Sequence, residues 1–200
     1  MTTTADLHVV LLAAGSSSRF GSPKLLADVH GRPMLVRALE TLLTVAREDR
    51  IVVVLGADAA RLEPLVHDAK VTVVINQEHA DGMASSIRAG LTRVPEDCPG
   101  VLIALADQAA ITAGDLRRLV DAWWEQPGRI AAAGYGDVTG VPAIFPAAVV
   151  DQLVRLQGDR GARELLRREA GQVVVVPMST AAIDVDTPAD LAAVVGALGR

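Results

Sequence analysis

The chain has 200 residues, of which 50% are hydrophobic, with a formal net charge of −5 and one cysteine, Cys98. This length suits one α/β domain, so we expect residues 1–200 to form a single domain. The acidic balance argues against nonspecific binding to nucleic acid or to an anionic membrane, and one cysteine excludes an intrachain disulfide and a cysteine metal cluster. The first residues carry no basic side chain and no apolar run is long enough to span a membrane, so we expect a cytoplasmic protein.

An apolar run of strand length, Leu7 to Ala13, leads directly into a loop of glycine and serine that closes on Lys24. Gly15 lets the backbone turn sharply and approach a ligand closely, while Arg19 and Lys24 bring positive charge. A Walker A loop is excluded, because Gly15 and Gly21 are too far apart and the lysine is not followed by serine or threonine. A dinucleotide fingerprint is excluded as well, because no glycine stands two residues after Gly15. The pattern predicts a loop that holds a polyphosphate; a surface turn with incidental basic residues is the other interpretation.

Strands and helices are predicted to alternate over the next hundred residues. The pattern predicts a helix at Met34–Val45 that buries Leu35, Leu39, Leu42 and Leu43, a strand at Ile51–Leu55, a short helix at Ala59–Val66 interrupted by Pro64, a strand at Val71–Ile75, a helix from Gly82 to Leu91, a strand at Val101–Ala106 and a helix from Thr112, its N-cap, to Trp124. Such alternation favours parallel strands joined by right-handed crossovers. We therefore expect an α/β, three-layer, Rossmann-like domain: a mostly parallel sheet with helices on both faces, and a ligand at the carboxyl ends of its strands.

Polar residues follow the third and fourth predicted strands. Asn76, Gly82 and Ser86 come after the third strand, where a helix N-terminus would offer unpaired N–H groups. Asp107 ends the fourth strand, and a carboxylate at the tip of a central strand needs a partner. A Mg²⁺ ion that bridges phosphates is one such partner; the alternative is that Asp107 caps a following helix.

The C-terminal third of the chain differs in composition, because it contains a glycine-rich segment. A strand is predicted at 130–134, then a glycine-rich segment at 134–146 that a β-hairpin would also explain, a helix at 147–156, a strand at 173–176 and a last helix opened by Thr187 and Pro188. Asp159 can cap the helix that follows it, and Arg160 and Arg163 could reach an anion. A helix cap at Asp159, with Arg160 and Arg163 as solvent-exposed charges, explains the same residues equally well.

Three motifs carry a family resemblance. Residues 12–24 resemble the signature L-A-A-G-x-S-x-R-x-G-x-x-K of nucleotidyltransferases with the nucleotide-diphospho-sugar transferase fold, and every fixed position is filled. The run G-D-x-G-A-R-x-L-L at 158–166 and the ending D-x-D-T-P-x-D-L at 184–191 narrow the resemblance to the molybdenum cofactor cytidylyltransferases, within the MobA-like NTP transferase family. The chain departs from the pattern at His79, where an aromatic residue is frequent, and at Ala109, which stands in place of proline.

The resemblance implies a role for each matching residue. Lys24, Arg19 and Asp107 would be catalytic; the nucleotide would be bound by Leu12, Ala13, Ala14, Gly15, Ser16, Ser17, Asn76, Gly82 and Ser86; Asp107 and Asp186, preferred over Asp184, would hold Mg²⁺; and Gly140, Pro142, Arg160 and Arg163 would bind the acceptor. Asp190 would only cap the last helix.

The implied reaction transfers CMP from CTP to the terminal phosphate of molybdenum-bearing molybdopterin and releases pyrophosphate. The partners would be CTP, a molybdopterin-type substrate, and a molybdoenzyme or its chaperone. The Ala13-Ala14-Gly15 form resembles the cytidylyl branch of the family, whereas the guanylyl branch tends to carry two glycines. Two alternatives stay open: an NAD(P)H-dependent oxidoreductase on the same scaffold, which would not require Asp107 and Asp186, and a cofactor-carrying protein without catalysis, which Trp123 and Trp124 would favour if both were exposed.

Overall fold

The computed structural model describes residues 7–159 and 161–198. Its centre is a seven-stranded sheet in the order β5-β4-β1-β6-β8-β7-β9. The strands are β1 (His8–Ala13), β4 (Ile51–Leu55), β5 (Thr72–Ile75), β6 (Gly100–Leu105), β7 (Ile130–Tyr135), β8 (Val138–Pro146) and β9 (Val173–Pro177). β5, β4, β1 and β6 are parallel, β8 runs antiparallel to both β6 and β7, and β9 is parallel to β7. The sheet is therefore mostly parallel, as predicted.

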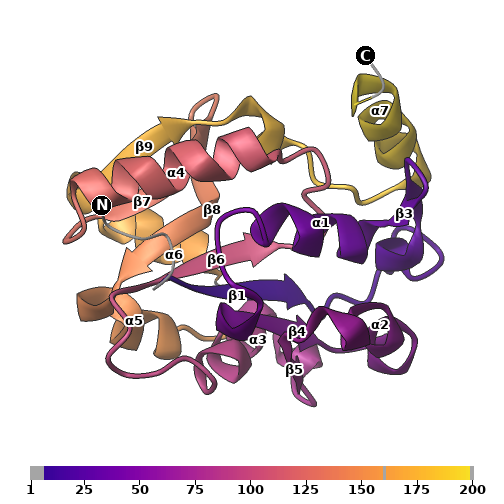
Figure 1. Cartoon of the computed structure of the whole chain (residues 1–200), viewed down its shortest axis with the longest axis horizontal. Coiled ribbons are helices and arrows are strands. Elements are labelled where there is room, and N and C mark those ends of the chain that lie inside the picture. Colours follow the sequence, from indigo (N-terminus) through magenta and orange to yellow (C-terminus); the bar gives the residue numbers. More distant parts are fainter. Residues whose placement is uncertain (1–6, 160, 199–200) are drawn as a thin grey trace.

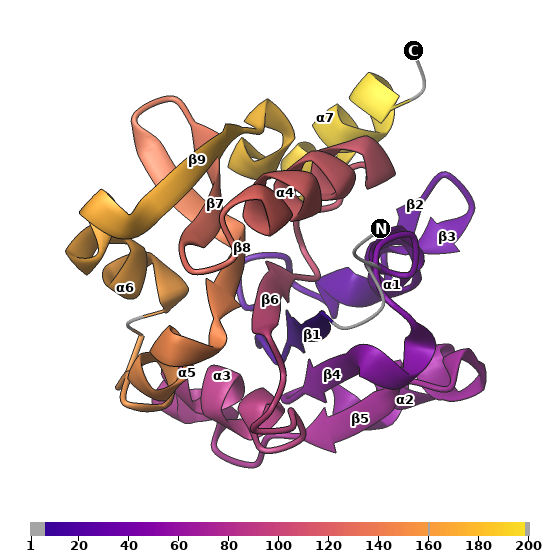
Figure 2. The same ribbon diagram turned by 60° about the vertical axis from the view of Figure 1, so that its left-hand side comes forward.

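Helices cover both faces of the sheet (Figures 1 and 2). One face packs against α1 (Met34–Leu42), α2 (Ala59–Val66) and α4 (Ala113–Glu125), and the other against α3 (Met83–Leu91), α5 (Ala147–Val154) and α6 (Ala162–Arg168). In β1, Val9 and Leu11 belong to the first core, while Val10 and Leu12 belong to the second. Alternate strand residues thus bury apolar side chains on opposite faces, which explains the unbroken apolar runs in the sequence. The three-layer prediction is confirmed.

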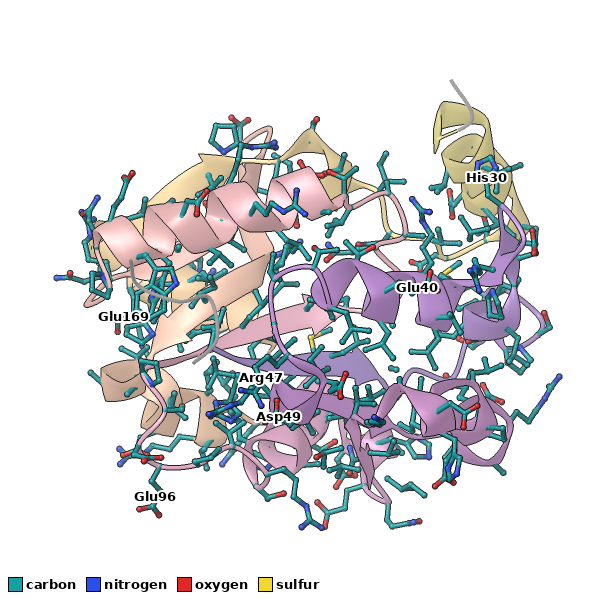
Figure 3. All side chains as sticks on the ribbon, in the orientation of Figure 1. His30, Glu40, Arg47, Asp49, Glu96 and Glu169 are labelled. Carbon is teal, nitrogen blue, oxygen red and sulfur yellow. The ribbon has the colours of Figure 1, made fainter. Side chains whose placement is uncertain are left out.

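Short elements complete the chain. They are the 3₁₀ helices η2 (Lys24–Leu26), η3 (Glu48–Arg50), η4 (His67–Ala69), η5 (His79–Asp81), η6 (Ala170–Gln172) and η7 (Ser179–Ala182), the small hairpin of β2 (Asp28–Val29) and β3 (Arg32–Pro33), and the last helix α7 (Pro188–Leu198). His30, at the tip of the hairpin, lies beside α7 (Figure 3), where its Nε2 is 2.9 Å from the carbonyl oxygen of Val195. Across the described ranges, no helix is long and apolar enough to cross a membrane.

Several local predictions are wrong. α1 ends at Leu42, so Leu43 lies beyond the buried stripe and is 37% exposed. α2 has the predicted bounds Ala59–Val66, but Pro64 lies inside the helix and does not interrupt it. The missing N–H of Pro64 removes one backbone hydrogen bond from the helix. The segment at 134–146 is part of the β7–β8 hairpin, so the hairpin interpretation holds and the sheet gains an antiparallel strand.

The two tryptophans do not form an exposed pair. Trp123 is fully buried beneath the sheet, and Trp124 is partly buried against it, with ring centroids 4.6 Å apart. Adjacent residues of a helix point about 100° apart. Trp123 and Trp124 therefore leave α4 in different directions, and both contact apolar residues of the core. The argument for a docking surface at these residues is therefore wrong.

Candidate functional site

The glycine and serine loop joins the carboxyl end of β1, at Ala13, to the start of η2, at Lys24. Ser17 has a positive φ of 53°, and its Oγ accepts a hydrogen bond of 3.1 Å from the backbone N–H of Lys24. The backbone N–H of Phe20 donates to the carbonyl of Ser17 at 3.0 Å. These bonds close the loop upon itself, while Gly15, Ser16 and Arg19 stay exposed.

A cavity, which we call the loop cavity, lies between this loop and the ends of β1 and β6. It is lined by Leu12, Ala13, Gly15, Ser16, Ser17, Ser18, Arg19, Lys24, Leu25, Asp107 and Asp186. Five of the six nucleotide-binding residues predicted at 12–17, all but Ala14, therefore face one space together with both predicted metal ligands and both predicted cations.

Lys24 lies between the two aspartates. Its Nζ donates to Asp107 Oδ2 at 2.7 Å and to Asp186 Oδ1 at 2.9 Å, and Arg19 contacts the other oxygen of Asp186 at 2.8 Å. Burial would lower the pKa of Lys24, but the two carboxylates outweigh it and raise that pKa above its usual value. Two cations and two anions thus meet at the mouth of the loop, and Lys24 remains protonated.

The acids also suit a divalent cation. Asp107 Oδ1 is buried and has no hydrogen-bond partner among the described residues, and hard cations prefer carboxylate oxygen. No group of three His, Cys, Asp or Glu side chains suited to a metal occurs in residues 7–159 and 161–198. An ion at Asp107 and Asp186 would therefore take its remaining ligands from substrate phosphate and water.

Asp107 does not cap a helix. The next helix, α4, begins at Ala113, and Thr112 caps it as predicted, with Asp115 completing a reciprocal capping box. Burial would raise the pKa of Asp115, but hydrogen bonds from Thr112, Thr180 and Arg118 lower it. The capping interpretation of Asp107 is wrong, because five residues separate it from α4.

A second cavity, which we call the helix cavity, lies between the loop and the start of α3. Ala14, Gly15, Ser16, His79, Gly82 and Ser86 line it together with Asp107. Gly82, at the N-cap of α3, has a φ of 93°, and a Cβ there would lie 2.5 Å from both Asp159 and Gly158. Only glycine fits this close approach. His79, to which the sequence assigned no role, is a lining residue.

Asn76 does not line either cavity. Its Nδ2 donates to Ser85 Oγ at 2.8 Å and to Ser86 Oγ at 3.0 Å, and its Oδ1 accepts from the N–H of Glu78 at 2.9 Å. Two of these bonds tie Asn76 to the first turn of α3, and the third lies in the segment that joins β5 to α3. Asn76 therefore positions this segment rather than facing the open space.

A third cavity, which we call the hairpin cavity, lies on the β7–β8 side. It is lined by Leu12, Met83, Ile103, Leu105, Gln108, Tyr135, Val141, Asp159, Gly161, Ala162, Arg163 and Asp184. Leu12 lines all three cavities, so they meet over the carboxyl end of β1. Of the residues predicted to bind the acceptor, Arg163 lines this cavity.

The predicted acceptor residues separate in the structure. Arg163 lines the hairpin cavity and donates to the Tyr135 hydroxyl at 3.0 Å. Gly140 supports that ring, because a Cβ at Gly140 would lie 2.5 Å from the hydroxyl oxygen. Pro142 is buried and lines a small apolar cavity beneath. Arg160 lies outside the described residues.

Asp159 lines the helix and hairpin cavities and does not cap α6, whose N-cap is Gly161 without a side-chain hydrogen bond. The capping interpretation of Asp159 is wrong, because the carboxylate points back toward Gly82. Asp190 does cap α7: its Oδ2 accepts from the N–H and the hydroxyl of Thr187, each at 2.8 Å.

Gln108 is a residue that sequence reasoning missed. It is 4% exposed, and its Nε2 donates to the carbonyls of Ala181 at 3.0 Å and Val141 at 3.2 Å. One side chain thereby links the segment after β6 to β8 and to η7. Its signal in the sequence was a polar residue beside Asp107. The neighbouring Ala109, in the place of the expected proline, is held through its carbonyl by Arg37 Nε at 3.0 Å.

Comparison with known proteins adds the family. The MobA-like NTP transferase domain matches residues 9–173 of this chain. Nicotine blue oxidoreductase of Paenarthrobacter nicotinovorans is 33% identical over 89% of this chain and 91% of its own length. A probable molybdenum cofactor guanylyltransferase of Rhodopirellula baltica is 33% identical over 91% of this chain and 88% of its own length.

Solved structures share the fold. The Rv0371c homologue from Mycobacterium sp. strain JC1 superposes with a TM-score of 0.83 at 26% identity, covering 99% of this chain and 98% of that one. Rv0371c of Mycobacterium tuberculosis H37Rv in complex with manganese superposes with a TM-score of 0.77 at 26% identity, covering 96% of this chain and 98% of that one.

Proposed function

The chain belongs to the MobA-like NTP transferase family, a family of nucleotidyltransferases, and we propose that it transfers CMP from CTP to the terminal phosphate of molybdenum-bearing molybdopterin. The observation that carries this proposal is the position of Lys24 between Asp107 and Asp186 at the mouth of the loop. Cations and carboxylates gathered at one strand end suit a metal-bound triphosphate.

The reaction needs alignment and charge neutralisation more than covalent catalysis. A phosphate oxygen of the acceptor would attack the α-phosphate of CTP, and pyrophosphate would leave. The attacking phosphate is already ionised, so no general base is required. The exposed loop from Gly15 to Arg19 would bind the triphosphate through backbone N–H groups and the Arg19 guanidinium.

Lys24 would offset the charge that develops on the leaving pyrophosphate. Its ammonium already faces the loop cavity, held there by two carboxylates. Asp107 and Asp186 would hold Mg²⁺, and the unpartnered Oδ1 of Asp107 fits that role. When bound, the ion supplies charge neutralisation of the phosphates. The manganese complex of the mycobacterial relative supports a divalent cation in this role.

The preference for CTP rests on the Ala13-Ala14-Gly15 form of the loop. Ala14 lines the helix cavity, and its methyl group reduces the space available to a purine. The methyl group also packs against Gly56, where an added Cβ would lie 2.8 Å from it. The name of the Rhodopirellula relative describes guanylyl transfer in that protein, so the base has to be measured directly in this one.

The acceptor is proposed from the resemblance and from the hairpin cavity, which adjoins the loop cavity at Leu12. A molybdoenzyme or its chaperone would receive the nucleotide-bearing product. Since Trp123 is fully buried, this recipient would have to dock elsewhere than on the tryptophan pair.

One panel tests the proposal. CTP, GTP, ATP, NADH and NADPH are each added with and without Mg²⁺, and thermal stability and pyrophosphate release with molybdopterin are measured. Mg²⁺-dependent stabilisation by CTP together with pyrophosphate release is the expected result. Stabilisation by NADH or NADPH alone, indifferent to Mg²⁺, would overturn the proposal and favour a reductase, the activity that the name of the Paenarthrobacter relative describes for that protein.

A further inference from the structure

Asp184 and Asp186 stand two residues apart before α7, but they line different cavities. Asp186 lines the loop cavity and contacts Lys24, whereas Asp184 lines the hairpin cavity. Val185, between them, is fully buried, and its N–H donates to the carbonyl of Asp107 at 3.1 Å. Asp184 is close enough to Asp107, Asp186 and Lys24 to interact with their charges, and it accepts a hydrogen bond from the Gln108 side chain. Its carboxylate nevertheless lines the hairpin cavity and not the loop cavity, so its remaining acceptor positions are available to a ligand there.

The hairpin cavity carries more acid than base among its described lining residues. Asp159 and Asp184 are its two acids, and Arg163, its one cation, already donates to the Tyr135 hydroxyl. Most of the remaining wall is apolar, including the side chains of Leu105 and the neighbouring strands. Asp159 and Asp184 would repel an anionic group of a ligand in this cavity. An apolar ring with hydrogen-bond donors at its edge would instead be accommodated.

Gln108 adds a further acceptor to this wall. Its amide nitrogen donates to the carbonyls of Val141 and Ala181, and the side chain also hydrogen-bonds Asp184, which fixes the orientation of the amide. Its Oε1 is buried and has no partner among the described residues. A buried acceptor without a partner is unfavourable, and a donor on a ligand in the hairpin cavity would satisfy it. The amide oxygen of Gln108 and the carboxylates of Asp159 and Asp184 are all hydrogen-bond acceptors, so each of them favours a ligand that carries N–H donors.

We propose that the hairpin cavity recognises the acceptor substrate through N–H donors on a flat heterocycle, and that Asp184 is the residue that determines this specificity. The inference rests on the proposed function, because it takes the occupant of this cavity to be the phosphate-bearing acceptor. The acceptor phosphate lies toward Lys24 and Asp107, and the amino edge of its ring meets Asp184, with Gln108 beside it.

The test separates the ring from the nucleotide. The full chain is titrated calorimetrically, without nucleotide, with pterin-6-methyl phosphate and with its 2-dimethylamino analogue, in which methyl groups replace the amino donors. A separate titration uses Mg²⁺ with a non-hydrolysable CTP analogue. Wild type is expected to bind the amino compound at least about tenfold more tightly, since a hydrogen bond to a charged group has that order of effect. Asp184→Asn is expected to reduce this preference to about threefold or less by weakening binding of the amino compound, and to change the nucleotide titration by less than about threefold, because Asp184 interacts with Asp107, Asp186 and Lys24 through charge and does not line the loop cavity.

Two variants control the result. Asp186→Asn is expected to weaken the nucleotide titration at least about tenfold while it keeps the preference for the amino compound. Asp151→Asn, an exposed acid on α5, is expected to change neither. The inference is overturned if wild type binds the two pterins equally or binds neither, or if Asp184→Asn keeps the full preference. Failure of the nucleotide titration alone would overturn the proposed function and leave the ring specificity standing.

Discussion

Replacement of Lys24 by methionine tests whether its ammonium holds the two aspartates together. Methionine keeps a comparable length and apolar stem but removes the charge. The side chain of Lys24 is 11% exposed, and those of Asp107 and Asp186 are 22% and 32% exposed. Breaking a fully buried pair costs about 3–5 kcal/mol. Water reaches these carboxylates in part, and Arg19 still pairs with Asp186, so we expect a loss of about 2 kcal/mol in the free energy of unfolding.

Urea unfolding measures this loss. With a slope of about 2 kcal/mol per molar urea, the midpoint should fall by about 1 M. Mg²⁺ should restore part of the loss in the variant, because it can neutralise the freed carboxylates. The matched control is Arg61→Met, which removes an exposed cation on α2 and should leave the midpoint within about 0.3 M. An unchanged midpoint for Lys24→Met would refute the reasoning, because the two ion pairs would then contribute nothing to stability.

Three further outcomes are expected. Asp107→Asn should lower pyrophosphate release at least about 10²-fold and should destabilise less than Lys24→Met, by about 1 kcal/mol, because the pair between Lys24 and Asp186 remains; steady-state turnover and urea unfolding measure the two effects, and near-wild-type turnover would remove Asp107 from the site. Gly82→Ala should cost about 2 kcal/mol by urea unfolding, since its φ of 93° and its contact with Gly158 exclude a side chain, whereas Gly171→Ala, with open space around it, should cost about 1 kcal/mol or less. The pKa of Asp115 is lowered from its usual value of 3.8, so its stabilisation is present above that value and is lost as the pH falls through the folded-state pKa. The stability difference between wild type and Asp115→Asn should therefore be largest at neutral pH and decrease as the pH falls below 3.8, and a difference that grows on acidification would contradict the sign.

Much of the fold could be predicted from local pattern. The apolar runs of β1, β4 and β6 are long enough for strands and too regular for turns, and the capping box of Thr112 and Asp115 marks the start of α4 to the residue. Leu43 shows where such reasoning fails. Its spacing fits the apolar stripe of α1, but the helix ends one residue earlier, and helix ends depend on what the next segment packs against.

The antiparallel strand β8 could not be placed from the sequence. Its residues suit a hairpin in any surroundings, and local pairing with β7 was foreseen as one interpretation. Its second pairing, with β6, joins Val101 to Phe145. That register depends on the burial of both faces of the sheet, which no window of neighbouring residues contains.

The sequence by itself determined the loop and its chemistry: glycine for the turn, serines without bulk, and two cations at fixed positions. Only the tertiary structure decided which acids these cations meet. Lys24 contacts one carboxylate 83 residues away and another 162 residues away, while Asp184 is directed to a different cavity and Asn76 is engaged by α3. Such contacts follow from the order of strands in the sheet and from the burial that fixes each loop. These are properties of the whole chain, and no short segment specifies them.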